Sequence, residues 1–353
     1  MPHPHLADSI PRWQRAQFRN GGEAAAGDLV QLRPEGLYCP AGDFHIDPWQ
    51  PVPRAVITHG HGDHARIGMG EYHATRAGLP ILRWRLGDQV YRAYDHGEAF
   101  ALGHARVSLH PAGHVLGSAQ VRIEVDGQVW VVSGDYKRQH DPTCAPFEVV
   151  PCDTFITEAT FGLPIYRWPD TAEVARDILA WRDECADRGE AAILFCYALG
   201  KAQRVLAEVA AHTDEPAWLH GAIAAGVEVY RHAGVLMPAT RLVTEERGAD
   251  FSGKLVIAPP SAAGSPWMRR FRRAQQGFAS GWMRIRGNRR RRNYDRGFVV
   301  SDHADWPALM RTVRETGARR VIGTHGNTDA ILRALNEEGI AAEAFATHFG
   351  DEE

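Results

Sequence analysis

A short run rich in imidazole and carboxylate groups, His-Gly-His-Gly-Asp-His, occupies residues 59–64. It follows the segment 54–58, whose sequence Arg-Ala-Val-Ile-Thr predicts a strand. Imidazole nitrogens and carboxylate oxygens are ligands that zinc and similar ions take in proteins. In an extended loop the spacing lets His59 and His61 reach one ion, and Asp63 and His64 then point to a second. The run therefore predicts a metal centre rather than a surface histidine loop.

The remaining ligands must come from the ends of later strands. His114 lies in a glycine-flanked loop, Asp135 follows an expected strand, and His325 follows another. A carboxylate at position 135 could bridge two ions. We expect two ligand sets that share Asp135, which are His59, His61 and His114 for one ion, and Asp63, His64 and His325 for the other.

Strand and turn signals surround these residues in two separate parts of the chain. Residues 121–125 and 128–133 predict a hairpin, because Asp126-Gly127 between them favours a type I′ turn. A further strand is expected over 154–157. After residue 298 we expect, in order, a strand over 298–301, a helix from about 305, a strand over 320–323 and a helix that ends near 339.

The middle of the chain has a different pattern. Asp170 and Glu173 form a candidate capping box, and the helix after them places an apolar face at 174, 178, 181 and 185. Residues 191–199 predict a buried strand, and a second helix is expected from about Lys201. Residues 166–298 therefore predict an α/β unit of their own.

The order of the candidate ligands resembles the metallo-β-lactamase superfamily: HxHxDH, then a lone histidine, then an aspartate after a strand. The resemblance implies an αββα sandwich that binds two metal ions. It also implies that Asp47, in Phe-His-Ile-Asp-Pro, supports the histidine loop without binding metal. Zinc is favoured by the imidazole ligands, and manganese is the alternative.

Three later positions narrow the resemblance. Glu158 in Thr-Glu-Ala-Thr, His303 in Ser-Asp-His-Ala and His325 in Thr-His-Gly are similar to motifs A, B and C of the β-CASP nucleases. That group processes nucleic acids and carries its β-CASP domain inside the lactamase fold. The resemblance therefore implies a lactamase part over 28–165, an inserted β-CASP domain over 166–298 and a second lactamase part over 299–353. The composition of residues 21–27, Gly-Gly-Glu-Ala-Ala-Ala-Gly, predicts that 1–27 is a flexible N-terminal extension.

Within that group, the phrases at 36–43, 199–204 and 258–267 resemble bacterial ligase-associated DNA exonucleases. This implies a DNA exonuclease of repair that acts with an ATP-dependent DNA ligase and a helicase. One residue favours the alternative of an RNA-processing nuclease of the mRNA 3′-end type: a histidine at motif C, here His325, tends to mark the RNA enzymes of the superfamily.

The chemistry that the resemblance implies is hydrolysis of a phosphodiester. Two bound divalent ions would supply a hydroxide near neutral pH and neutralise phosphoryl charge. His303 would protonate the leaving oxygen, and Glu158 would orient His303 and favour its charged form. The resemblance also gives Asp63 a catalytic role beside its role as a ligand.

Arginines concentrate between residues 269 and 296, where eleven occur in an otherwise acidic chain. Arginine pairs with phosphate, and the aromatic residues among them could stack on unpaired bases. The alternative is a solvated basic loop with core aromatics. Lys201, at an expected helix start, could hold a terminal phosphate, and Lys137 is a similar candidate. The expected nucleic-acid contacts are Lys137, Lys201, Arg269, Arg270, Arg273, Arg289, Arg290, Arg291 and Arg292.

Composition sets the remaining limits. The chain has 353 residues and a formal net charge of −3, so positive charge for nucleic acid must be local. No apolar stretch is long enough for a membrane span, so no membrane partner is expected. Five cysteines without CxxC pairs suit reduced thiols in the cytoplasm.

Two further classes of protein compete with a nuclease. A non-catalytic nucleic-acid-binding partner subunit would have lost its metals, and the full set of candidate ligands argues against it. A hydrolase of small thioesters or lactams would need neither the arginine-rich middle unit nor the pair Glu158 and His303. The sequence therefore favours the nuclease.

Overall fold

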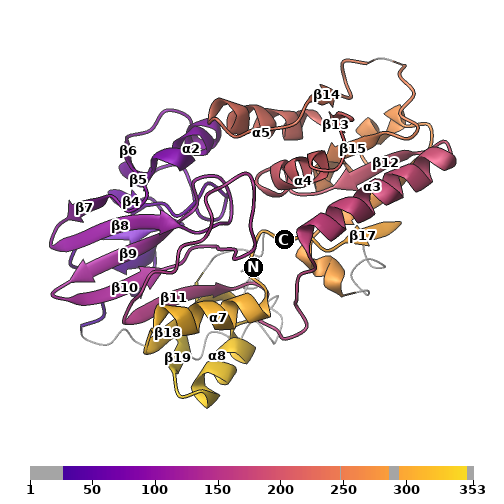
Figure 1. Ribbon diagram of the computed structural model, residues 1–353. Helices are drawn as coiled ribbons and strands as arrows, with labels where there is room; N and C mark the ends of the chain where they lie inside the picture. Colours follow the sequence, from indigo (N-terminus) through magenta and orange to yellow (C-terminus); the bar gives the residue numbers. More distant parts are fainter. Residues whose placement is uncertain (1–26, 247, 286–293, 348–353) are drawn as a thin grey trace, which may run out of the picture.

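The computed structural model describes residues 27–246, 248–285 and 294–347, which form an α/β fold with three β-sheets (Figure 1). The expected N-terminal extension up to residue 26 and the arginines at 289–292 lie outside these ranges. No helix within them combines the length and the apolar character needed to cross a membrane.

The first sheet has six strands in sequence order. They are β1 (Gln31–Arg33), β2 (Gly36–Cys39), β3 (Phe44–Ile46), β4 (Arg54–Val56), β5 (Glu71–Thr75) and β6 (Tyr91–Tyr94). β3 to β6 run parallel, so β4 delivers the histidine run to an edge where parallel strands end. The short turn η2 (Arg76–Gly78) and helix α2 (Leu79–Leu86) follow β5, and α2 packs on the outer face of this sheet.

The second sheet has the order β19-β18-β11-β10-β9-β8-β7. Its strands are β7 (Ala99–Leu102), β8 (Ala105–Pro111), β9 (Ala119–Val125), β10 (Gln128–Val132), β11 (Thr154–Ala159), β18 (Arg320–Gly326) and β19 (Ala341–Ala344). Helices α7 (Trp306–Thr316) and α8 (Thr328–Glu337) cover its outer face. Its inner face packs against the first sheet through one apolar cluster that includes Phe44, Val56, Val107 and Ile156. The two sheets and their helices therefore form four layers.

The third sheet is parallel throughout, in the order β14-β13-β15-β12-β16-β17. Its strands are β12 (Ala191–Phe195), β13 (Ala217–Leu219), β14 (Thr240–Leu242), β15 (Leu255–Ala258), β16 (Ala274–Ala279) and β17 (Arg296–Phe298). Helices α3 (Thr171–Asp187), α4 (Lys201–Ala210) and α5 (Gly221–His232) pack on one face. The other face is covered by loops and the short turns η3 (Pro260–Ala262), η4 (Pro266–Arg270) and η5 (Gly281–Arg284).

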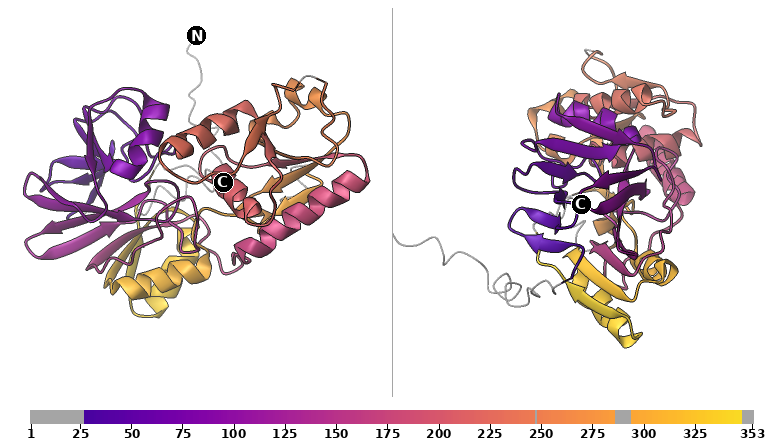
Figure 2. Two further views of the ribbon diagram at one scale, coloured as in Figure 1. Left: turned by 45° about the horizontal axis from the view of Figure 1, so that its top comes forward. Right: turned by 90° about the vertical axis from the view of Figure 1, so that its left-hand side faces the viewer.

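The chain leaves the two-sheet sandwich after β11 and returns to it before α7. β11 and β18 are neighbours in parallel register although the whole third sheet lies between them in sequence. The third sheet lies beside the sandwich (Figure 1 and the left view of Figure 2), where α5 contacts α2 and the Tyr230 hydroxyl lies 3.3 Å from the Leu116 nitrogen.

Several local predictions are confirmed. β9 and β10 form the expected hairpin, with positive φ at both Asp126 (50°) and Gly127 (81°), as a type I′ turn requires. The Asp170 half of the expected capping box is present, since its side chain accepts from the backbone nitrogens of residues 172 and 173, and the helix expected from about 305 is α7, which Asp305 caps.

Two expected strand boundaries differ from the structure, and one strand is new. β12 ends at Phe195 instead of 199, because the chain there turns into the loop that contacts the histidine run. β17 covers Arg296–Phe298, so most of the segment 298–301 is the connection to α7. β19 was not expected.

Candidate metal centre

The candidate ligands meet at one edge of the two-sheet sandwich. The histidine run follows β4, His114 follows β8, Asp135 follows β10, and His325 lies near the end of β18. Gly134 allows one close approach, because it has φ +56° and a Cβ there would lie 2.7 Å from the Thr58 side chain. The glycine therefore lets the Asp135 loop lie directly against the histidine loop.

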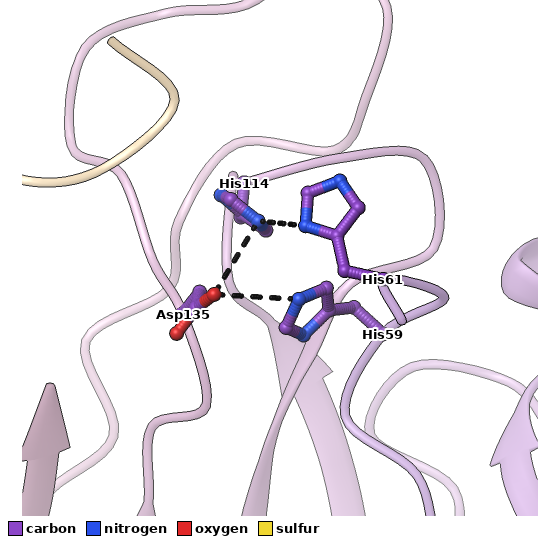
Figure 3. A group of neighbouring side chains, drawn as sticks. All are labelled: His59, His61, His114 and Asp135. Carbon is purple, nitrogen blue, oxygen red and sulfur yellow. Dashed lines mark hydrogen bonds and ion pairs between the residues drawn. The ribbon is translucent and has the colours of Figure 1, made fainter. Parts of the chain in front are cut away.

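A first group comprises His59, His61, His114 and Asp135, which offer one ligand atom each within 4.8 Å of one another (Figure 3). His61 Nδ1 lies 3.1 Å from His114 Nε2. Asp135 Oδ2 lies 3.4 Å from His59 Nε2 and 3.7 Å from His114 Nε2. The structure thus brings together the three histidines expected to share an ion, with the expected bridging carboxylate beside them.

A second group comprises His64, Asp135 and His325. His325 Nε2 lies 3.1 Å from Asp135 Oδ1, and His64 Nε2 lies 3.4 Å from Asp135 Oδ2. Asp135 therefore belongs to both groups, as a bridging ligand must. Asp63, expected in this set, lies 3.5 Å from His64 Nε2 but is not within 4.8 Å of every member.

The electrostatics of this cluster fit divalent cations. Burial first, and then the neighbouring imidazoles, hold the pKa of His59 and of His114 well below the usual range, so both rings are neutral. Burial alone would lower the pKa of His64, but the carboxylates of Asp135, Asp63 and Asp47 raise it to about 10. The buried Asp63 Oδ1 accepts no hydrogen bond from any described residue. Cations would satisfy these acceptors, and metal binding would displace the proton from His64.

Outer hydrogen bonds fix three of the rings from within the sandwich. His64 donates from Nδ1 to Asp47 (2.7 Å), which also accepts from the Thr58 nitrogen (2.8 Å) and hydroxyl (2.5 Å). The same hydroxyl lies 3.0 Å from His59 Nδ1, and the Thr324 hydroxyl lies 3.0 Å from His325 Nδ1. Such contacts select the tautomer that leaves the inner nitrogen available for metal. Asp47 thus lies beside His64, where the family resemblance implies a supporting role.

A buried acid–base pair adjoins the two groups. His303 Nδ1 lies 2.8 Å from Glu158 Oε2, and the Glu158 carboxylate also accepts from the Tyr136 nitrogen (2.7 Å) and the Thr160 hydroxyl (2.6 Å). One oxygen of Glu158 and one nitrogen of His303 lie within 4.8 Å of an Asp135 oxygen. Because the carboxylate is anchored, it holds the His303 ring at the edge of the cluster.

A cavity of about 250 Å³ opens onto the cluster between the sandwich and the third sheet. His61, His114 and His303 line one side, and Tyr197 and Lys201, from the loop after β12 and the start of α4, line the other. The cavity is thus the place where a substrate would meet both the candidate ligands and the candidate acid.

The expected nucleic-acid contacts are spread over different environments. Lys137 is buried and does not line the cavity, which argues against a direct contact with nucleic acid. Lys201 is buried too, but it lines the cavity and lies 3.7 Å from Asp302 Oδ2. Arg269 and Arg270 are exposed on η4, and Arg273 pairs with Glu190 (3.2 Å). The contacts expected at 289–292 lie outside the described residues and stay predictions.

The aromatic residues near these arginines are partly core. Phe271 and Phe278 are buried in the cluster that covers one face of the third sheet. Their rings pack on other rings, Phe271 on Trp267 and Phe278 on Tyr294. The interpretation that they stack on bases is therefore wrong for these two residues, and the alternative of core aromatics holds for them.

Sequence reasoning missed three charged residues around the centre. Arg85 lines the cavity and donates to the Gly60 carbonyl (2.6 Å), so it braces the histidine loop. Asp302 and Arg204 are buried behind His114. The sequence held a signal for both, because Asp302 is next to His303 in its motif and Arg204 ends the motif at 199–204. Residue type alone did not indicate what either side chain contacts.

No family model matches the chain. A "Probable DNA ligase" of Opitutus terrae is 31% identical over 88% of this chain and 30% of its own length. The "RNase J-like protein" of Methanocaldococcus jannaschii is 24% identical over 56% of this chain and 54% of its own length. "Cleavage and polyadenylation specificity factor 73" of Drosophila melanogaster is 31% identical over 38% of this chain and 22% of its own length.

The chain spans only about a third of the ligase-named relative and about half of the RNase J-like one. Among solved structures, a protein of unknown function from Enterococcus faecalis V583 matches with a TM-score of 0.56 and 12% identity, over 86% of this chain and 81% of its own. That likeness concerns the fold alone. Together with the ligand positions at one sheet edge, these sequence relatives support the resemblance of this chain to the β-CASP group of the metallo-β-lactamase superfamily.

Proposed function

We propose that this chain is a metal-dependent phosphodiesterase of nucleic acid, and specifically a DNA exonuclease that acts in repair with an ATP-dependent DNA ligase. The relative named as a probable DNA ligase supports this proposal, because almost the whole of this chain matches under a third of that protein. A helicase of the same pathway is a further proposed partner.

The proposed fold follows the family. The sandwich would be the metallo-β-lactamase unit, made of residues 28–165 and 299–353, and the β-CASP unit would be residues 166–298. The parallel pairing of β11 with β18 around the inserted third sheet supports this division.

Two divalent ions would bind in this centre. His59, His61 and His114 would hold one, Asp63, His64 and His325 would hold the other, and Asp135 would touch both. Zinc suits this imidazole-rich set, and manganese is the alternative. When bound, the ions would supply an activated water and neutralise phosphoryl charge.

The observation that carries the proposal is the Glu158–His303 pair at the cavity edge. Because Glu158 accepts the Nδ1 proton, the other nitrogen, Nε2, is left to exchange a proton with a substrate. A protonated Nε2 would donate to the leaving oxygen of a phosphodiester, whose departure as an alkoxide is otherwise slow. A thioester hydrolase has no need of such a donor, because a thiolate leaves without being protonated.

A second candidate is an RNA-processing nuclease. Relatives named as endoribonucleases match 43% of this chain, and one named as RNase J-like matches 56%. The same residues would serve, because the phosphodiester chemistry is common to RNA and DNA.

Degradation of end-labelled single strands would test the proposal. The full chain would be supplied with zinc or manganese and given DNA and RNA of one sequence in parallel. We expect DNA to shorten progressively and RNA to persist. Internal cleavage of RNA with intact DNA would favour the second candidate, and binding of both without cleavage would mean a non-catalytic partner subunit.

A further inference from the structure

The histidines of the two ligand groups are held from different parts of the molecule. His59, His64 and His325 bond outward to Thr58, Asp47 and Thr324, which all belong to the sandwich. His61 and His114 bond outward to backbone carbonyls instead. His61 Nε2 lies 3.3 Å from the Leu199 oxygen, and His114 Nδ1 lies 2.8 Å from the Asp302 oxygen. Both carbonyls lie on segments that connect to the third sheet.

The Leu199 carbonyl is presented by a tight turn between β12 and α4. Gly200 follows it with φ +86°, and a Cβ at that position would lie 2.4 Å from a Val115 methyl group and 3.8 Å from His61 Nε2. The Gly200 nitrogen donates to the Gln203 side chain (2.8 Å), which holds the turn at the start of the helix. The turn therefore lies directly on the loops that carry His61 and His114.

The Asp302 carbonyl is held by α4 as well. Arg204 donates from Nη1 to the Ser301 carbonyl (2.5 Å) and from Nη2 to the Thr171 hydroxyl (2.9 Å). The same Nη1 lies 3.8 Å from Asp302 Oδ1, while Lys201 Nζ lies 3.7 Å from Asp302 Oδ2. Arg204, Lys201 and Asp302 are buried, so the contacts among them are shielded from water and salt. One guanidinium thus connects α3 and α4 to the loop that orients His114.

We propose that Arg204 is a positioning residue that sets the affinity of the ion held by His59, His61 and His114, and leaves the ion held by Asp63, His64 and His325 unaffected. The inference rests on the two-ion centre of the proposed function. Outer partners of metal-binding histidines contribute about 10- to 100-fold to metal affinity. The third sheet would then control one half of the centre through a single buried side chain.

A double-mutant comparison separates the two halves. The His325→Ala chain should retain only the ion site that contains His61. The His61→Ala chain should retain only the ion site that contains His325. Arg204→Gln would be added to each, and zinc affinity would be measured by competition with a chromophoric chelator. We expect a loss of about 10- to 100-fold in the His325→Ala chain. In the His61→Ala chain we expect a change below about twofold, because His64 and His325 are held by Asp47 and Thr324 of the sandwich.

The same measurement of zinc affinity would be made on a control variant. Arg182→Gln removes an arginine of α3 that pairs with Asp183 (2.7 Å) at the surface, and should change neither affinity. Equal losses in both backgrounds, or no loss in the His325→Ala chain, would overturn the role of Arg204.

Circular dichroism would show whether each variant is folded. Should Arg204→Gln fail to fold, Arg204→Lys keeps the charge but loses the forked donors, and the same selective loss is expected at smaller size. Equal or absent losses there would overturn the inference equally. An unmodified chain that binds fewer than two zinc ions would contradict the proposed function itself, which is a different result.

Discussion

The histidine cluster and the arginines near η4 are the candidate sites for metal ions and for nucleic acid, and they differ in burial and in how firmly their side chains are held. Each ring of the cluster is buried or nearly so and has a fixed outer partner, such as Asp47 for His64. Arg269, Arg270 and Arg272 are exposed and make no ion pair within the described ranges.

The difference predicts how each region responds to change. In the cluster every side chain positions its neighbours. A single substitution there should therefore cause a large loss of activity, and the losses from two substitutions should not simply add. At the surface each arginine would contribute a small, salt-screened share that adds to the others. The following variants test that contrast from the largest effect to the smallest.

Removal of a candidate ligand should be the most severe change. His61→Ala takes away an imidazole 3.1 Å from His114 Nε2, so one ion should lose its site. We expect a loss greater than the roughly 10²–10⁴-fold of a missing general acid, on natural and activated phosphodiesters alike. Elemental analysis after metal saturation would check the cause. Two ions still bound per chain would refute His61 as a ligand.

Removal of the candidate acid should be selective. His303→Ala should retain both ions and still lose roughly 10²–10⁴-fold in turnover of a natural strand. On a nitrophenyl phosphodiester the loss should shrink, because that leaving group needs no proton. Equal losses on both substrates would remove the acid role and point to His303 as a residue that positions phosphate or supports the metals.

Removal of the anchoring charge should be milder again. Glu158→Gln keeps the shape that accepts from Tyr136 and Thr160 but removes the charge beside His303. We expect a loss of roughly 10–100-fold, as for other residues that act through a partner, with the same dependence on the leaving group. A loss as large on the activated substrate as on the natural one would separate Glu158 from proton donation.

The sequence predicts the candidate metal ligands better than it predicts the groups that orient those ligands. HxHxDH after a strand marks the ligands because residue type and spacing are both local. The carbonyls of Leu199 and Asp302 leave no such trace, since any residue has a carbonyl and only the fold brings it to a histidine. The same holds for β19, whose sequence Ala-Ala-Glu-Ala has little strand preference and which is formed by its pairing with β18.

The arginine-rich segment 269–296 shows what composition alone does not predict. Composition identified a basic segment, but it did not separate rings that pack the core, such as Phe278, from groups that face water. That separation depends on which side of β16 a residue occupies, and the alternation there is obscured because both faces of the sheet are covered. A direct test of the surface is therefore needed.

The smallest effect should come from that surface. Arg269, Arg270 and Arg272 would be changed together to glutamine, and binding of single-stranded DNA measured at several salt concentrations. Each lost phosphate contact lowers the slope of log affinity against log salt by about 0.7, so up to about 2 is expected, with metal content unchanged. A matched triple change at Arg314, Arg319 and Arg333, which pair with Glu338, Asp153 and Glu337, removes the same charge from the sandwich. If both triple variants lower the slope equally, the overall charge of the protein guides the strand, and not the surface at η4. The arginines near η4 would then differ from the histidine cluster only in being exposed, and they would not be a binding site.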